Sequence, residues 1–229
     1  MSNVMHKDIR TLAYVLRRTN YGEADRILNL ITPENGKISA IAKSVRREKS
    51  KLAGGIEMFS LVELNVHFGK GEMGTITSAK MLKYYDKLLM DLGKMELAAL
   101  ILKKISLASD SSDNSEFFEI IKQCFDHLNK GTSNSLVEAW FWLNYAKAVG
   151  EQVNVYRDID GDMLKADNEY EWNREENALM VRKGGSVNAD VIKLIRLMLT
   201  SGLDVVSRVK NCDDLLPPIL TIARAVNKL

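Results

Sequence analysis

The chain of 229 residues is 46% hydrophobic and 27% charged and carries a formal net charge of +2, which is the composition of a folded globular protein with enough length for one large domain or two small ones. Its two cysteines cannot form a disulfide framework, and its apolar runs fall far short of the roughly 18 residues that a membrane-spanning helix needs. Because the N-terminus also lacks a charged start followed by an apolar core, these features argue against a secreted or membrane protein, and we expect a cytoplasmic one.

Positive charge is concentrated in the first third of the chain. Residues 1–80 contain 13 Lys and Arg against 8 Asp and Glu, whereas residues 81–229 contain 19 against 22. Such an asymmetry indicates that the two parts of the chain meet different partners.

Alternation with a period of two runs from Arg10 to Lys80, interrupted by turns rich in glycine. The predicted strands lie at about 12–16, 27–31, 38–42, 62–68 and 75–81. Five short strands fit a small closed barrel, and the long connection 46–55 after the third strand is typical of an OB-fold. The strand count alone does not exclude an SH3-like barrel.

Beyond residue 86 the apolar period changes to 3.6, which predicts amphipathic helices. The predicted helices lie at about 97–108, 117–128, 135–150, 189–201 and 214–228. Ser135 to Glu138 has the form of a capping box, and Gly150 is placed to end the same helix. Of the aromatic run Trp140 to Trp142, we expect two residues in the core.

The predicted fold class is therefore α+β. A five-stranded OB-fold barrel in residues 1–83 forms a nucleic-acid-binding domain, and residues 84–229 form a mostly helical domain. The polar segment of about 151–186 contains the turn Asp160-Gly161 between extended runs, so we expect a β-hairpin insert there.

The strongest local signal for function is the segment 43–51, which holds five basic side chains and one acid. Flexible basic heads on a barrel loop suit the phosphate backbone of a nucleic acid, with salt-dependent binding. The predicted DNA-binding residues are Arg17, Arg18, Lys37, Lys43, Arg46, Arg47, Lys49 and Lys51. A loop that is charged only for solubility is the alternative for this segment taken alone.

Aromatic side chains on an OB-fold can stack against bases. The candidates are Tyr14, Tyr21, Phe59 and Phe68. Tyr14 and Phe68 lie within apolar alternation, so we expect these two in the core.

A longer pattern then points to a family. The segments that carry it are Val15 to Leu28, Thr32 to Lys37, Ala42 to Arg47, Leu52 to Gly55 and Phe59 to Leu64. Together they resemble the opening signature of the RecO family of DNA-repair recombination mediators, across most of residues 9–85. The helical remainder is similar in architecture and length. Ser44 stands where the family often has glycine, and Glu48 where it often has proline.

The resemblance implies a protein that binds single- and double-stranded DNA, anneals complementary strands and helps load recombinase onto strands coated by single-strand-binding protein. It implies a RecR-like partner, docking of the C-terminal tail of single-strand-binding protein on the helical domain, indirect contact with the recombinase, and association with the nucleoid. Lys37, Lys43, Arg46 and Arg47 fall on the basic surface that similar proteins use for DNA.

One departure from the family concerns metal. Many RecO proteins hold zinc through four cysteines after the long helix, yet residues 151–186 contain neither cysteine nor histidine. We therefore expect no metal or other cofactor, and a hairpin packed around Tyr156, Leu164, Tyr170 and Trp172 in place of the zinc module. Asp158 to Asp162 lacks the spacing of a calcium loop.

Catalytic motifs are absent from the sequence: it has no phosphate-binding Gly-Lys-Ser/Thr loop and no Gly-x-Ser-x-Gly. We expect a protein that is not an enzyme. Two alternatives stay open beside a DNA-binding mediator, namely a protein–protein adaptor whose barrel does not bind DNA, and an RNA-binding OB-fold protein.

Overall fold

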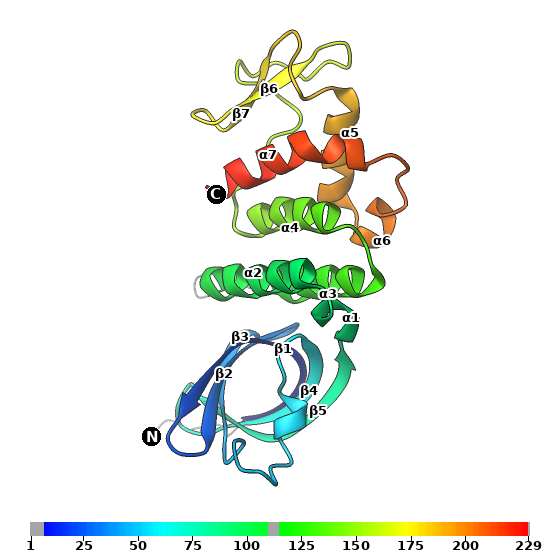
Figure 1. The fold of residues 1–229 in the computed structure, drawn as a ribbon. Helices are drawn as coiled ribbons and strands as arrows, with labels where there is room; N and C mark the ends of the chain where they lie inside the picture. The colour runs from blue at the N-terminus through cyan, green and yellow to red at the C-terminus, as the bar shows by residue number, and fades with distance from the viewer. Residues whose placement is uncertain (1–6, 110–114, 229) are drawn as a thin grey trace. The chain divides into compact units, whose positions relative to one another are not determined.

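A computed structural model describes residues 7–109 and 115–228 of the chain, which divides into two compact units, residues 1–125 and 126–229 (Figure 1). The first unit groups the barrel with the helices that follow it. The division by fold type into residues 1–83 and 84–229 stays a prediction.

Five strands of the described part of the first unit close into a barrel in the order β1-β2-β3-β5-β4. They are β1 (Lys7–Tyr21), β2 (Asp25–Thr32), β3 (Gly36–Ala42), β4 (Ser60–Phe68) and β5 (Gly74–Tyr84). Neighbouring strands are antiparallel except for β3 and β5, which are parallel. This topology, with a long β3–β4 connection that contains η1 (Ala53–Gly55), confirms the predicted OB-fold.

The interior of the barrel holds the apolar side chains of the alternating pattern, because successive residues of a strand point to opposite faces. The strand residues of this core are Ala13, Val15, Leu28, Leu30, Ala40, Ala42, Val62, Leu64, Val66 and Ile76. Gly22 and Gly36 occupy the tight turns with φ of 55° and 57°, a region that favours glycine.

Helices cover one end of the barrel within the first unit (Figure 1). They are α1 (Asp86–Leu89), α2 (Leu92–Ala108) and the first part of α3 (Ser115–Lys130). The boundary between the units falls within α3, and its residues 115–125 belong to the first unit. Tyr14 is buried beneath them, with its ring centroid 5.1 Å from that of Phe118 and its hydroxyl oxygen 2.9 Å from that of Tyr85. The expectation that Tyr14 is a core residue is confirmed.

The second unit consists of short helices and a hairpin. Its elements are α4 (Asn134–Ala148), β6 (Tyr170–Asn173), β7 (Ala178–Val181), α5 (Ala189–Thr200), α6 (Leu203–Val206), η2 (Asp213–Leu215) and α7 (Leu216–Val226). The predicted helices and the hairpin insert are confirmed, although the paired strands are shorter than the extended runs of the sequence. No helix of the described ranges is both long and apolar enough to cross a membrane.

Two details of α4 differ from the sequence predictions. The cap of α4 is Ser133, not Ser135, and its hydroxyl accepts a hydrogen bond from the Leu136 amide at 3.4 Å. Trp140, Phe141 and Trp142 are all buried, because α4 packs against both α5 and α7 and has apolar neighbours on more than one side.

Tyr156 does not belong to the packed part of the hairpin. Tyr170 and Trp172 are buried as predicted, but Tyr156 is half exposed and the Arg196 guanidinium lies 4.9 Å from its ring centroid. Arg196 also donates two hydrogen bonds to the Val155 carbonyl, at 2.6 and 3.0 Å, which fixes the cation over the outer face of the ring.

Candidate nucleic-acid interface

The segment 43–52 leaves β3 and turns back across the end of the barrel; we call it the basic loop. The Ser44 amide donates to Asp25 Oδ1 at 2.6 Å, and the Arg46 amide donates to the Ala24 carbonyl at 2.8 Å. The Val45 side chain is only 3% exposed and joins the barrel core. The basic loop is therefore anchored to the β1–β2 turn through its backbone amides, and Val45 and Leu52 pack against the barrel core.

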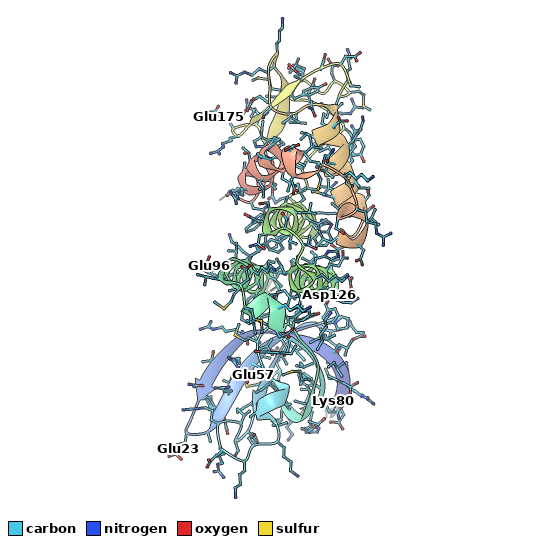
Figure 2. The ribbon with its side chains drawn as sticks, turned by 45° about the vertical axis from the view of Figure 1, so that its right-hand side comes forward. Glu23, Glu57, Lys80, Glu96, Asp126 and Glu175 are labelled. Atoms are coloured by element: carbon cyan, nitrogen blue, oxygen red, sulfur yellow. The ribbon has the colours of Figure 1, made fainter. Side chains whose placement is uncertain are left out.

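The five cations of the basic loop all face solvent. Lys43, Arg46, Arg47, Lys49 and Lys51 are exposed, and within the described ranges none of them forms an ion pair. The Arg46 guanidinium lies 3.4 Å from the Gly22 carbonyl, which leaves most of its donors available. Figure 2 shows Glu23, in the same β1–β2 turn, at the end of the barrel that faces away from α1 and α2.

Arg17 is exposed on the outer surface of the barrel, in the row that crosses the middle of β3. Its register partner on β2 is Asn29, which accepts a hydrogen bond from Ser39 of β3 at 3.2 Å. The outer surface of β1, β2 and β3 therefore continues from the basic loop toward Arg17, on the strands that OB-folds use for nucleic acids.

Two of the predicted DNA-binding residues are engaged within the protein. The Lys37 ammonium donates to the Ser106 carbonyl in the last turn of α2 at 2.8 Å. Lys37 is six positions before Lys43, so about 20 Å of strand separates them at roughly 3.3 Å per residue. Arg18 Nη1 lies 2.7 Å from Glu57 Oε2 in an ion pair. The structure thus brings the loop cations together and places Lys37 at the other end of the barrel.

Asp25 is the positioning residue that sequence reasoning missed. Its carboxylate accepts a hydrogen bond from the Ser44 amide, whereas the neighbouring Arg26 donates from Nε to the Asn20 side chain at 3.3 Å. Ser44 has a φ of 53°, a conformation that this carboxylate bond helps to hold. An acid beside a glycine turn is the only signal that the sequence offers for this role.

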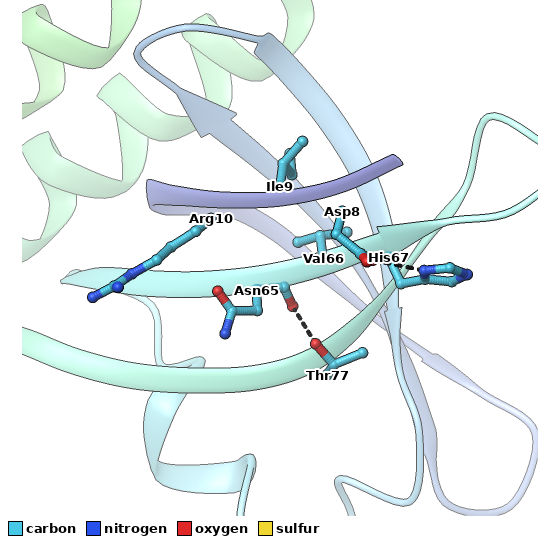
Figure 3. A pocket seen from close by; sticks show the side chains of 7 residues that line it. All are labelled: Asp8, Ile9, Arg10, Asn65, Val66, His67 and Thr77. Carbon is cyan, nitrogen blue, oxygen red and sulfur yellow. Dashed lines mark hydrogen bonds and ion pairs between the residues drawn. The ribbon is translucent and has the colours of Figure 1, made fainter. Parts of the chain in front are cut away.

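Away from the basic loop, a hollow of about 570 Å³ lies over β1, β4 and β5 of the barrel (Figure 3). It is lined by Asp8, Ile9, Arg10, Asn65, Val66, His67 and Thr77. His67 Nδ1 lies 2.7 Å from Asp8 Oδ1, and Arg10 makes a bidentate pair with Glu63 at 2.9 and 3.0 Å. Because Arg10 is already paired with Glu63 and Asp8 adds an acid to the lining, this hollow suits phosphates less well than the basic loop does.

A cluster of titratable side chains in the second unit is formed by His127, Lys130 and Asp204. The His127 ring contacts Thr132 Oγ1 at 3.0 Å and Asp204 Oδ1 at 3.1 Å. Burial lowers the pKa of His127, and the nearby Lys130 ammonium lowers it further. Lys130 also hydrogen-bonds Asp204 and lowers the pKa of that carboxyl. The cluster joins the end of α3 to α6, and no group of metal-ligating side chains is found within residues 7–109 and 115–228.

Comparison with known proteins places the barrel in a family. Residues 5–85 match the family model described as "Recombination protein O N terminal". The barrel is thus similar to the N-terminal domain of RecO proteins. Its relatives named DNA repair protein RecO include one from Dehalococcoides mccartyi strain CBDB1, which is 26% identical over 228 residues, 95% of this chain and 88% of the relative. The proposed resemblance to RecO is thereby confirmed.

Other RecO relatives match over a shorter stretch. The protein named DNA repair protein RecO from Rubrobacter xylanophilus is 32% identical over 142 residues, 62% of this chain and 57% of the relative. The one from Heliobacterium modesticaldum is 32% identical over 141 residues, 62% of this chain and 51% of the relative. In these two cases the match spans little more than half of the relative's length.

Proposed function

We propose that this protein belongs to the RecO family and is a recombination mediator of DNA repair. It binds single- and double-stranded DNA at the end of its barrel that carries the basic loop, which we call the open end. The observation that carries the proposal is the cluster of five solvent-facing cations on the basic loop, held in place by Asp25 and Val45. The loop belongs to a fold that binds oligonucleotides through neighbouring strands and loops.

The chemistry is binding and not bond making. Each lysine or arginine that meets a phosphate releases condensed counterions, which supplies affinity without base specificity. Because the backbone of the loop is anchored, only the side chains must be ordered on binding, and the entropic cost of complex formation is smaller. Neutralised phosphates repel one another less, so two complementary strands held by such cations can approach and anneal.

The test is fluorescence anisotropy of a labelled single strand across a salt series, with wild type and the variant Lys43→Ala/Arg46→Ala/Arg47→Ala. Loss of three phosphate contacts should flatten the slope of log K against log salt by roughly 2, at about 0.7 per contact, and weaken all strand sequences alike. The control variant Lys80→Ala/Lys87→Ala/Lys103→Ala removes the same charge from exposed positions outside the basic loop. Equal effects of the two variants would contradict a site on the loop.

Two other outcomes would select the rival functions. A wild-type protein that binds no strand at any salt concentration would favour a protein–protein adaptor. A wild-type protein that prefers a matched RNA strand in competition would favour RNA binding, since an OB-fold suits either nucleic acid.

The partners follow from the family. We propose a RecR-like protein, the C-terminal tail of single-strand-binding protein and, indirectly, the recombinase. A groove of about 460 Å³ along α5 is lined by Leu194, Leu197 and Leu215, which suit the apolar end of such a tail. Its two lysines, Lys193 and Lys210, are balanced by Asp190 and Asp214. Lys193 pairs with Asp190 at 3.0 Å, so the apolar surface and not the charge supports this contact. Binding of a labelled acidic peptide, measured by the same anisotropy method, tests this contact.

A further inference from the structure

The outer surface of β1, β2 and β3 near the basic loop forms an ordered grid, which we call the open face. Cross-strand partners share a face, so the register defines its rows. The rows are Arg17, Asn29 and Ser39; then Thr19, Ile27 and Ile41; then Tyr21 with Asp25. Lys43 follows the end of β3 on the same side as Ile41, at the border of the open face.

Tyr21 is the aromatic residue of the open face, and its side chain is 56% exposed. The other three candidates for base stacking are engaged elsewhere. Tyr14 is buried, the Phe59 ring lies 6.0 Å from that of Phe125, and Phe68 packs against the barrel core. The structure therefore singles out Tyr21 among the four aromatics that the sequence offered.

The middle row of the open face is apolar. Ile27 and Ile41 are register partners on the outer surface of the barrel and are only partly buried. An outer sheet surface that faced only water would carry polar residues at such positions. Beside an exposed tyrosine, the two isoleucines make a small apolar area bordered by cations, Arg17 on one side and Lys43 on the other.

Apolar area between two cations matches the chemistry of an unpaired nucleotide, which offers a flat base beside charged phosphates. In a duplex the bases stack on one another, so their faces are hidden and only their edges and the phosphates remain accessible. A tyrosine ring on this surface can therefore contribute to the binding of a single strand and not to that of a duplex.

We propose that Tyr21, with Ile27 and Ile41 beside it, is a base-stacking surface that gives the site a component specific for single strands, separate from the phosphate contacts of the basic loop. This inference rests on the proposed function and assigns a role in specificity to a residue that carries no charge. It predicts that affinity for single strands and affinity for duplexes can be separated by one substitution.

The experiment compares wild type with Tyr21→Leu on labelled single and double strands by anisotropy. Loss of one stacked base should weaken single-strand binding by roughly 5- to 150-fold. Duplex affinity and the salt slope should stay as in wild type, because no phosphate contact is removed. The conservative variant Tyr21→Trp should retain single-strand affinity, since its ring still stacks. Thermal unfolding verifies that both variants are folded.

A strand with abasic sites provides a second readout, because it has the phosphates but lacks the bases. Wild type should bind it as weakly as Tyr21→Leu binds the intact strand, and Tyr21→Leu should not distinguish the two strands. Equal losses on single and double strands, or no loss, would overturn the stacking role while the proposed function stands. If wild type binds no DNA at all, both the proposed function and this inference fail.

Discussion

The two ends of the barrel use the same residue type in opposite ways. At one end Lys37 donates its ammonium to the Ser106 carbonyl of α2, and its register partner Ile31 is buried. At the other end Lys43 is exposed and begins the basic loop. Both lysines belong to the same hairpin and both were predicted to bind DNA, yet one contacts a helix end while the other faces solvent.

The difference shows that a cation is available to a ligand only where the fold does not already hold it with a hydrogen bond or an ion pair. The last turn of a helix exposes carbonyl groups and the negative end of the helix dipole, so an ammonium there is held by the fold. Within the described part of the first unit, α1, α2 and the first part of α3 all lie at the Lys37 end and not at the end that carries the basic loop. The basic loop is held by the Asp25 carboxylate and by apolar packing instead, which leaves the charged heads free.

The largest expected effect concerns the packing that holds the open end. A Cβ on Gly55 would lie 2.7 Å from the Ala79 carbonyl oxygen, whereas a Cβ on Gly54 would meet nothing within 4 Å. Gly55→Ala should lower the free energy of unfolding by about 1–3 kcal/mol, because backbone must move. Gly54→Ala should change it by less than about 0.5 kcal/mol. Urea unfolding of the two variants tests this prediction. If Gly55→Ala and Gly54→Ala had similar stability, the close packing of Gly55 against Ala79 would not contribute to it.

A smaller and opposite pair of effects is expected for the two lysines themselves. Lys37→Met should cost about 1 kcal/mol of stability, through loss of the bond to the helix end, and leave DNA affinity unchanged. Lys43→Met should leave stability unchanged and flatten the salt slope by about 0.7. Methionine keeps the apolar stem in both cases. The measurements are chemical unfolding and DNA-binding anisotropy on both variants. If Lys37→Met weakened DNA binding as much as Lys43→Met does, the proposed difference between the two ends of the barrel would be wrong.

The smallest effect is expected at Glu57. Its ion pair with Arg18 contributes at most about 1 kcal/mol, since both side chains reach solvent. Glu57→Gln should release Arg18 toward the DNA and steepen the salt slope by about 0.7. The matched control is Glu63→Gln, which releases Arg10 from a similar pair away from the basic loop. A slope that is unchanged in Glu57→Gln, or equally changed in both variants, would show that Arg18 is not a latent DNA contact.

Much of the fold could be predicted from the sequence, because periodicity is a local property. Alternation along Val62 to Phe68 reports which side of that strand is buried, and a change to a period of 3.6 reports a helix. On the first strand the alternation of Leu12, Tyr14 and Leu16 indicated the wrong face, because the barrel interior takes Ala13 and Val15 while Tyr14 is buried on the other side against α3. The family signature around Tyr21 and Gly22 led to RecO for the same reason, since it is a continuous run of residues. The concentration of charge in residues 43–51 could be read directly.

The sequence by itself thus determined the OB-fold, the helices and the position of the basic loop. Only the tertiary structure decided which cations are free, because the partners of Lys37 and Arg18 lie 69 and 39 residues away along the chain. The same holds for Asp25, whose carboxylate fixes Ser44, and for Tyr21, which is exposed whereas the other three candidates for base stacking are packed. Pairing depends on which segments meet after folding, and no local pattern records that.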